Sequence, residues 1–271
     1  MTLASKQFDM ASATDVGRVR AHNEDSIAAD VDLGLATLAD GMGGYNAGEV
    51  ASAIAVAMVP QEMRKLSAAQ ALHGLSDEAV QQLLAAQASK VNGAIYTAAQ
   101  SQTQYTGMGT TLVIAYWHGD RVTVAHLGDS RCYRVRGAAV SPLTRDHSWI
   151  QKQIDAGLMT YEQARTSKKK NLVTRACGID LNVAPEVHTH AVEAGDIYVL
   201  CSDGLYDMVP DEEIHLTVSS LKSNLPLAAQ QLVQQANDNG GRDNISVILV
   251  HVLKVAQAPA GLIARLKNWF K

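Results

Sequence analysis

This 271-residue chain has few aromatic residues and no surplus of basic charge. Phe, Trp and Tyr together make up 5% of the residues, so Ala, Leu, Val and Ile must fill the core. The chain has 23 Lys and Arg against 27 Asp and Glu, which gives a formal net charge of −4. A dedicated nucleic-acid-binding protein normally carries a basic surface, so this charge argues against that class.

Cysteine residues and long apolar runs are also scarce. Cys132, Cys177 and Cys201 lie far apart, form no Cys-x-x-Cys metal pair and are odd in number, so we expect buried thiols in a reducing compartment. No apolar run approaches the roughly 18 residues that a membrane span needs. The N-terminal sequence lacks the pattern of a secretory signal. We therefore expect a soluble protein of the cytoplasm.

The order of strand-like and helix-like segments indicates an α+β fold built on antiparallel sheets. Apolar and β-branched segments predict strands at 8–16, 26–40, 110–117, 121–127, 131–136, 140–144, 187–192, 196–201 and 245–253. Helical spacing predicts helices at 49–66, 77–99, 211–219 and 225–237, the second of them capped by Ser76. Because this order lacks the regular strand–helix alternation of a parallel sheet, we predict one layered α+β sandwich.

Two segments differ in character from the rest of the chain. Residues 147–175 are polar and charged, with three consecutive lysines at 168–170, and we expect a mobile excursion outside the core. Residues 256–271 combine a short linker with a tail whose apolar and basic residues follow helical spacing. Such a tail can lie on an anionic membrane, dock into a partner or pack on its own domain, and the sequence leaves these alternatives open.

Four acidic residues occupy similar places in the predicted strand pattern. Asp40, Asp129 and Asp203 each follow an apolar strand, and Asp243 precedes the last one. Where strand ends converge, such carboxylates repel one another unless protons or a cation neutralise them. Oxygen ligands without His or Cys favour Mg²⁺ or Mn²⁺. An Asp-Gly pair taken singly is typical of an ordinary turn, so only the combination indicates a site.

Six short motifs occur in order along the chain and strengthen this interpretation. They are GRVRAHNED at 17–25, DGMGG at 40–44, GMGTT at 107–111, GDSR at 128–131, SDG at 202–204 and GRDN at 241–244. In this order, from about residue 8 to 253, the chain resembles the metal-dependent Ser/Thr protein phosphatases of type 2C, in their bacterial form.

The resemblance implies a particular α+β architecture. It is a four-layer αββα sandwich in which two antiparallel β-sheets are flanked by helix pairs. The catalytic domain would span residues 1–255 with a flap subdomain at about 148–175, and 256–271 would be a linker and a short basic amphipathic tail. As a hypothesis, the flap influences the choice of substrate more than the chemical step.

The resemblance also implies a centre of two Mn²⁺ or Mg²⁺ ions, with a possible third. Asp40 would bridge the two ions, and the carbonyl of Gly41 would bind the first. Asp203 and Asp243 would bind the second ion. Asp129 would help to hold a third and weaker one.

Three residues near the N-terminus would complete the site. Arg20 would bind the substrate phosphate, because its planar guanidinium matches the phosphate oxygens. Glu24 and Asp25 would orient waters held by the metal ions. A water activated by two metal ions would hydrolyse phosphoserine and phosphothreonine in proteins, opposing a bacterial Ser/Thr kinase.

The chain departs from the family where relatives place a proton donor for the leaving group. Many relatives carry His two or five residues after the bridging Asp, and this chain has Met42 and Tyr45 there. Water on a metal ion is the first candidate donor and His147 the second. For His147 we favour a surface histidine without a catalytic role, and for His22 a packing or capping role.

Two alternative functions remain open from the sequence. One is hydrolysis of small phosphate esters at the same metal centre, and the other is a non-catalytic module that binds phosphoproteins. Degenerate members usually lose metal-binding carboxylates, whereas Asp40, Asp203 and Asp243 are all present. Their presence favours the enzyme.

Overall fold

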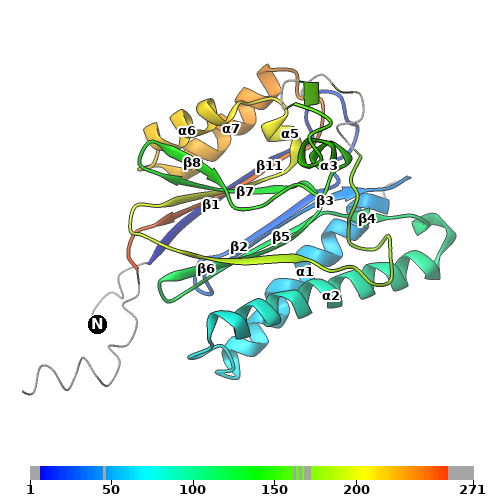
Figure 1. Ribbon diagram of the computed structural model, residues 1–271, viewed down its shortest axis with the longest axis horizontal. Coiled ribbons are helices and arrows are strands. Elements are labelled where there is room, and N and C mark those ends of the chain that lie inside the picture. Colours follow the sequence, from blue (N-terminus) through cyan, green and yellow to red (C-terminus); the bar gives the residue numbers. More distant parts are fainter. Residues whose placement is uncertain (1–6, 45–46, 161–162, 165–166, 168–171, 256–271) are drawn as a thin grey trace, which may run out of the picture.

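Two antiparallel β-sheets pack face to face and separate two groups of helices, which confirms the predicted αββα sandwich (Figure 1). The computed structural model describes residues 7–44, 47–160, 163–164, 167 and 172–255. The first sheet has the order β1 (Phe8–Asp15), β11 (Ile245–Val252), β10 (Ile197–Cys201), β7 (Arg131–Arg136) and β8 (Ala139–Pro142). The second has the order β2 (Asp25–Asp30), β3 (Leu35–Met42), β5 (Leu112–His118), β6 (Arg121–Leu127) and β9 (Glu186–Ala191), with β4 (Gly109–Thr110) paired to β3.

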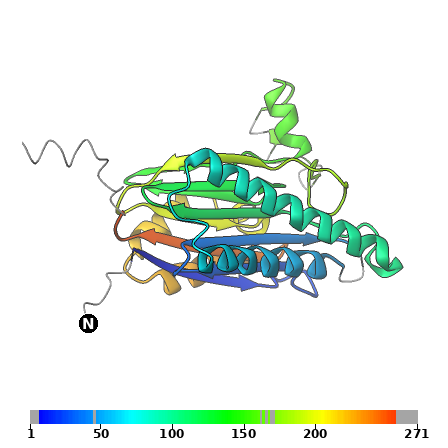
Figure 2. The same ribbon diagram turned by 90° about the horizontal axis from the view of Figure 1, so that it is seen from below.

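The helices form the two outer layers. Helices α1 (Ala47–Ala68) and α2 (Asp77–Ser101) lie along the second sheet, and α6 (Asp211–Ser220) and α7 (Leu225–Asp238) lie along the first (Figures 1 and 2). The shorter helices with bounds inside the described ranges are η1 (Thr103–Tyr105), α3 (Trp149–Asp155) and α5 (Asp203–Tyr206). Ser76 caps α2 as predicted, because its Oγ accepts a hydrogen bond from the Ala79 N–H at 3.2 Å.

The apolar strands are buried on both faces because each sheet lies between helices and the other sheet. In β3, Leu35 and Ala39 pack in the cluster formed with α1 and α2, while Ala36 and Leu38 pack between the sheets. Successive side chains of a strand point to opposite faces, so a continuous apolar run serves both layers. This double burial explains why the sequence of β3 shows little polar alternation.

Three aromatic residues pack against one another between the two sheets. The ring of Trp117 lies 5.2 Å from that of Tyr198 in an edge-on arrangement and 6.0 Å from that of Phe8. Aliphatic residues such as Leu200 and Ile248 fill the remaining space of this intersheet core. These three rings therefore join strands of both sheets.

The structure corrects the expected course of one segment and adds detail to a second. Residues 26–40 were expected to form one strand, but they form β2 and β3 joined by a turn, in which Asp30 Oδ1 accepts hydrogen bonds from the N–H groups of Asp32 and Leu33. The polar segment at 147–175 contains α3, and its two ends meet at a bridge between Ser148 and Val173. The three lysines at 168–170 and the tail at 256–271 lie outside the described residues. Among the helices of the described ranges, none has the length and apolar composition required to cross a membrane.

Shortening a side chain of the intersheet core tests this packing. Leu200 is fully buried between the sheets, so Leu200→Ala is expected to lower the free energy of unfolding by about 2–5 kcal/mol. Leu216→Ala is the matched control, because Leu216 of α6 is 65% exposed, and its expected change is within about 0.5 kcal/mol. Urea denaturation measures both, and equal losses would contradict the assignment of Leu200 to the core.

Candidate active site

The antiparallel order brings the acidic strand ends to one edge of the sandwich. Asp25 begins β2 and is the register partner of Asp40, which lies near the end of β3. The end of β6, which precedes Asp129, lies at this same edge because β5 pairs with both β3 and β6 in antiparallel fashion. In the other sheet, the end of β10 before Asp203 adjoins the start of β11 after Asp243. We refer to these five aspartates as the acidic edge.

Two side-chain contacts show how the acidic edge is held together. Ser202, which follows β10, donates its hydroxyl to Asp25 Oδ2 of the opposite sheet at 2.8 Å. Arg20 Nη2 lies 2.6 Å from Asp243 Oδ2. Asp25 and Asp129 are buried, whereas Asp40, Asp203 and Asp243 are partly exposed. The carboxylates thus form a partly open cluster with two members set beneath the surface.

Desolvation and mutual repulsion raise the pKa values of several carboxyl groups in this cluster. Removal from solvent and the charges of Asp25, Asp203, Asp129 and Asp243 raise the pKa of Asp40 well above its usual range. Desolvation and the charges of Asp129 and Asp243 do the same for the pKa of Asp203. Desolvation raises the pKa of Asp25 to about 6, and desolvation together with Asp146 raises the pKa of Asp129 to about 7. The cluster therefore has more negative charge than the surrounding protein groups neutralise.

The donor set fits divalent cations that prefer oxygen. Asp25 Oδ1 is buried and has no hydrogen-bond partner among the described residues. Ionised carboxylates only accept hydrogen bonds, so an unpartnered buried oxygen beside four further carboxylates calls for a cation. An all-oxygen set favours Mg²⁺ or Mn²⁺ over zinc. Asp40, Gly41, Asp129, Asp203 and Asp243 are thus suitably placed to hold such ions.

Two threonines that the sequence analysis did not single out fix the backbone of Asp40. The Asp40 N–H donates to Thr111 Oγ1 at 2.9 Å, and the Asp40 carbonyl accepts from the Thr111 N–H and the Thr110 hydroxyl, each at 2.8 Å. Thr111 Oγ1 also lies 2.7 Å from the hydroxyl of Ser130, the residue after Asp129. One buried side chain therefore links the segments that carry two of the carboxylates. Their place in the GMGTT and GDSR motifs was the only sequence signal for these residues.

Asn244 positions the loop that carries Arg20. Its Nδ2 donates to the carbonyls of Val16 and His22, at 3.0 and 2.9 Å, and its Oδ1 accepts from the Glu24 N–H at 2.9 Å. Gly17 has φ +82°, and a Cβ there would lie 2.3 Å from the Asp243 carbonyl oxygen, so the loop can approach this closely only with glycine. Arg20 remains 49% exposed beside Asp243.

Gly41 shows the same dependence on close backbone approach. Its N–H donates to the Glu24 carbonyl at 3.1 Å, and a Cβ at Gly41 would lie 2.2 Å from the carbonyl oxygen of Gly48 in α1. Glu24 lies within the field of Arg20 and Asp243, and desolvation is the main cause of its raised pKa. The segments carrying Glu24, Gly41 and the start of α1 therefore meet with no room for side chains.

The two candidate histidines have different positions. His22 is exposed, and its carbonyl takes part in anchoring the loop. The expectation that His147 is a surface histidine is wrong, because only 7% of this residue is exposed and its ring is stacked on His126. Burial and His126 lower the pKa of His147 to about 4, so it is neutral. Met42 lies at the end of β3, and Tyr45 lies outside the described residues.

The layered fold and the acidic edge define a class of protein, an αββα enzyme with a divalent-cation centre. Comparison with known sequences identifies the family: the model of Protein phosphatase 2C matches residues 17–246. Since this match covers most of the chain, the protein belongs to the protein phosphatase 2C family, which confirms the resemblance seen in the motifs.

Curated relatives support the same assignment. The serine/threonine phosphatase stp of Listeria monocytogenes is 36% identical over 240 residues, which cover 88% of this chain and 93% of that protein. The serine/threonine protein phosphatase PstP of Mycobacterium tuberculosis is 36% identical over 247 residues, 90% of this chain but 45% of that longer protein.

Solved structures agree in fold. The crystal structure of the Mycobacterium tuberculosis phosphatase PstP/Ppp matches with a TM-score of 0.80 and 33% identity, over 93% of this chain and 99% of that chain. The catalytic domain of PstP in complex with two manganese ions matches with a TM-score of 0.79 and 34% identity, over 91% and 99% of the two chains.

A threonine-to-valine pair tests the role of Thr111. Thr111→Val removes the acceptor of the Asp40 N–H and the contact with Ser130, and a buried group left unpaired costs about 1–3 kcal/mol. Thr37→Val on β3, the strand of Asp40, is the control, because the buried Thr37 Oγ1 has no hydrogen-bond partner among the described residues. We expect a loss of unfolding free energy for Thr111→Val and no loss for Thr37→Val. Equal effects in chemical denaturation would contradict this role.

The raised pKa values of the acidic edge predict how the stability of metal-free protein varies with pH. A carboxyl whose folded pKa exceeds the unfolded value of about 3.9 binds more protons in the folded state, so stability falls as pH rises toward the folded pKa. With Asp129 at about 7 and Asp40 and Asp203 raised well above normal, we expect the melting temperature in chelator to fall between pH 6.5 and 8. Buried neutral histidines do not oppose this above about pH 6.5, their unfolded pKa.

Scanning calorimetry at constant ionic strength checks this dependence. Asp40→Asn is expected to reduce the fall, because it removes one of the repelling charges. Saturating Mn²⁺ is expected to abolish it. A melting temperature that rises over the same pH range in chelator would contradict the prediction.

Proposed function

We propose that this protein is a metal-dependent protein-serine/threonine phosphatase that hydrolyses phosphoserine and phosphothreonine in proteins and acts opposite a bacterial Ser/Thr kinase. The observation that carries the proposal is the convergence of five aspartates from both sheets beside a partly exposed arginine. Membership of the protein phosphatase 2C family and relatives named as serine/threonine phosphatases support it. Mn²⁺ or Mg²⁺ fits the oxygen donors, and the PstP catalytic domain holds two manganese ions.

We assign the acidic residues the roles that the family resemblance implies, and their convergence at one end of the sheets supports this assignment. Asp40 would bridge two ions, with the Gly41 carbonyl on one ion and Asp203 and Asp243 on the other, while Asp129 would hold a third. When bound, the ions supply an activated water as nucleophile and neutralise the phosphate oxygens. Asp25, the buried register partner of Asp40 on the neighbouring strand, would orient waters of the site.

Arg20 is suited to bind the phosphate of the substrate. Although desolvation opposes its charge, the hydrogen bond and charge of Asp243 raise its pKa, so it stays a cation. Its exposed guanidinium can present two parallel N–H groups to phosphate oxygens. Asp243 fixes its orientation, and Asp203 and Glu24 add further negative charge nearby. The chain thereby places one fixed cation at the rim of the acidic edge.

The described residues offer no thiolate for a covalent mechanism. Cys132, Cys177 and Cys201 are buried and free, and burial raises the pKa of Cys132 and Cys177 to about 12. A thiol, unlike a thiolate, is a poor nucleophile, so attack by water accords with these residues. Buried free thiols also accord with action in the cytoplasm, a reducing compartment.

The organisation of the chain completes the proposal. We assign the catalytic domain to residues 1–255 and a flap to about 148–175. The assignment of the flap is supported by hydrogen bonds that hold its two ends together next to the site. The Trp149 N–H donates to the Leu172 carbonyl at 2.8 Å, and the His147 N–H donates to the Gly128 carbonyl at 2.9 Å. A flap rooted next to Asp129 would contact the phosphoprotein and influence its selection. Contact of the tail at 256–271 with a membrane or partner remains a hypothesis from its sequence.

Release of phosphate from a phosphothreonine peptide tests the proposal. Asp40→Asn is expected to lower kcat by about a hundredfold or more, because it removes a carboxylate shared by two ions. Asp32→Asn, in the exposed β2–β3 turn, makes the same chemical change away from the site and is expected to act like the wild type. Activity that survives chelator, or that is equal in the two variants, would overturn the two-metal assignment.

A further inference from the structure

His147 contacts the turn that carries Asp129 through both its backbone and its ring. Its N–H donates to the Gly128 carbonyl at 2.9 Å, and its Nδ1 accepts from the Gly128 N–H at 3.2 Å. Its carbonyl accepts from the Thr174 N–H at 2.7 Å, at the other end of the flap. One residue therefore joins both ends of the flap to the peptide before Asp129.

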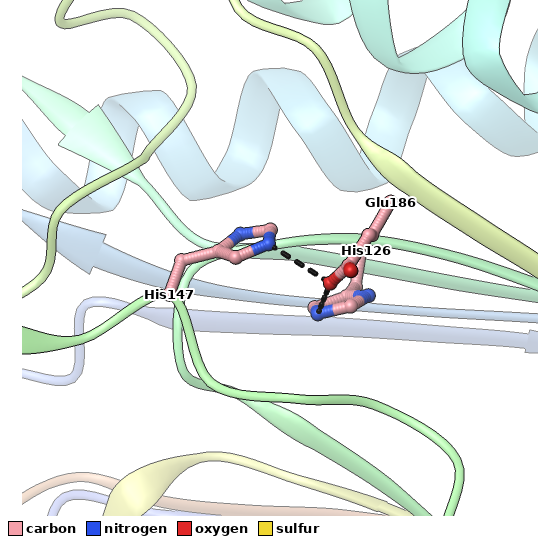
Figure 3. A group of neighbouring side chains, drawn as sticks. All are labelled: His126, His147 and Glu186. Carbon is pink, nitrogen blue, oxygen red and sulfur yellow. Dashed lines mark hydrogen bonds and ion pairs between the residues drawn. The ribbon is translucent and has the colours of Figure 1, made fainter. Parts of the chain in front are cut away.

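The hydrogen bonds define where the protons of the histidine cluster lie. Because His147 Nδ1 accepts, the proton of the neutral ring is on Nε2, which donates to Glu186 Oε2 at 3.2 Å (Figure 3). His126 Nε2 lies 2.8 Å from the Arg145 carbonyl, which can only accept, so this nitrogen also carries a proton. The two rings are stacked, with centroids 4.7 Å apart.

The same three side chains resemble a metal-binding triad in composition. Donor atoms of His126, His147 and Glu186 lie within 4.8 Å of one another. A metal ligand needs a free lone pair, but His147 Nε2 donates its proton to Glu186 (Figure 3) and His126 Nε2 donates its proton to the Arg145 carbonyl. The cluster is therefore built as a set of hydrogen bonds that orients His147.

The peptide of Asp129 is held from its other side as well. The hydroxyl of Tyr206 donates to the Asp129 carbonyl at 3.0 Å, and the Arg131 guanidinium lies 3.6 Å from the centre of the Tyr206 ring. Gly128 has φ +98°, and a Cβ there would lie 2.7 Å from Thr111 Cβ, so the turn is tightly confined. His147 and Tyr206 thus fix the two flanks of a buried carboxylate that repulsion would otherwise displace.

We propose that His147 is a positioning residue that holds the Gly128–Asp129 turn so that Asp129 can receive a divalent cation, with Glu186 and His126 fixing its ring. It acts through Asp129 and touches neither substrate nor attacking water. The proposal rests on the proposed function, since it takes Asp129 as a cation ligand. It also couples the base of the flap to this ligand.

Two near-isosteric variants of the full chain distinguish the role of His147 Nδ1 from the role of its Nε2. In His147→Asn, the amide oxygen can replace Nδ1 and accept the Gly128 N–H, but the contact with Glu186 is lost. In His147→Gln, the longer amide can reach Glu186, but no acceptor remains for Gly128. We expect His147→Gln to weaken the weakest Mn²⁺ binding step by about tenfold or more, and His147→Asn to stay within about threefold of the wild type.

Isothermal titration calorimetry with Mn²⁺ measures this step directly, and the half-activating Mn²⁺ concentration for p-nitrophenyl phosphate provides a second readout. Asp129→Asn supplies the background for a double-mutant cycle, in which His147→Gln should add no further loss of Mn²⁺ binding. Melting temperatures in chelator report any general loss of stability.

Three results would overturn the proposal. They are equal Mn²⁺ binding by the Asn and Gln variants, additive losses in the Asp129→Asn background, and a lower melting temperature with unchanged Mn²⁺ binding. Zn²⁺ binding that disappears in His126→Gln would identify a metal triad instead. Failure of the proposed function has a different signature, because the wild type itself would then show no Mn²⁺-dependent phosphate release.

Discussion

Repulsion among carboxylates held at one edge of the sandwich is the constraint on which the rest of the structure depends. Five aspartates from both sheets lie within one another's electrostatic influence, and Arg20 forms an ion pair with one of them, Asp243. The apolar layers hold these charges together although the charges favour separation. The fold therefore fixes the positions of these carboxylates, but the protein does not neutralise their negative charge. A cation site requires this combination.

Small polar side chains maintain that geometry. Thr111 fixes the peptide of Asp40 and contacts Ser130, Ser202 reaches from one sheet to Asp25 of the other, and Asn244 organises the loop that ends in Glu24. These groups hold backbone or carboxylate atoms and leave charge unneutralised. Neutral hydroxyl and amide groups thus fix the positions of the backbone and the carboxylates, and the carboxylates remain available to bind cations.

Much of this arrangement could be predicted from the sequence, for physical reasons that differ between regions. The strands and the main helices follow from local apolar spacing, and the convergence of Asp40, Asp129, Asp203 and Asp243 follows from antiparallel order. The turn at Asp30 was missed because apolar residues on both sides mask it. The burial of His147 could not be predicted, because it depends on His126 and Glu186, which are distant in sequence and meet only after β6 pairs with β9.

The pairing of β1 with β11 has a consequence for anything joined to this domain. Asp15 is the register partner of Ile245 near the acidic edge, and Phe8 is the register partner of Val252 at the far end. An eight-residue strand spans about 25 Å, so Phe8 and Val252 lie side by side at the pole opposite the site. Fusion partners or tethers attached beyond either strand would leave from that pole, and adjacent exits of this kind suit circular permutation.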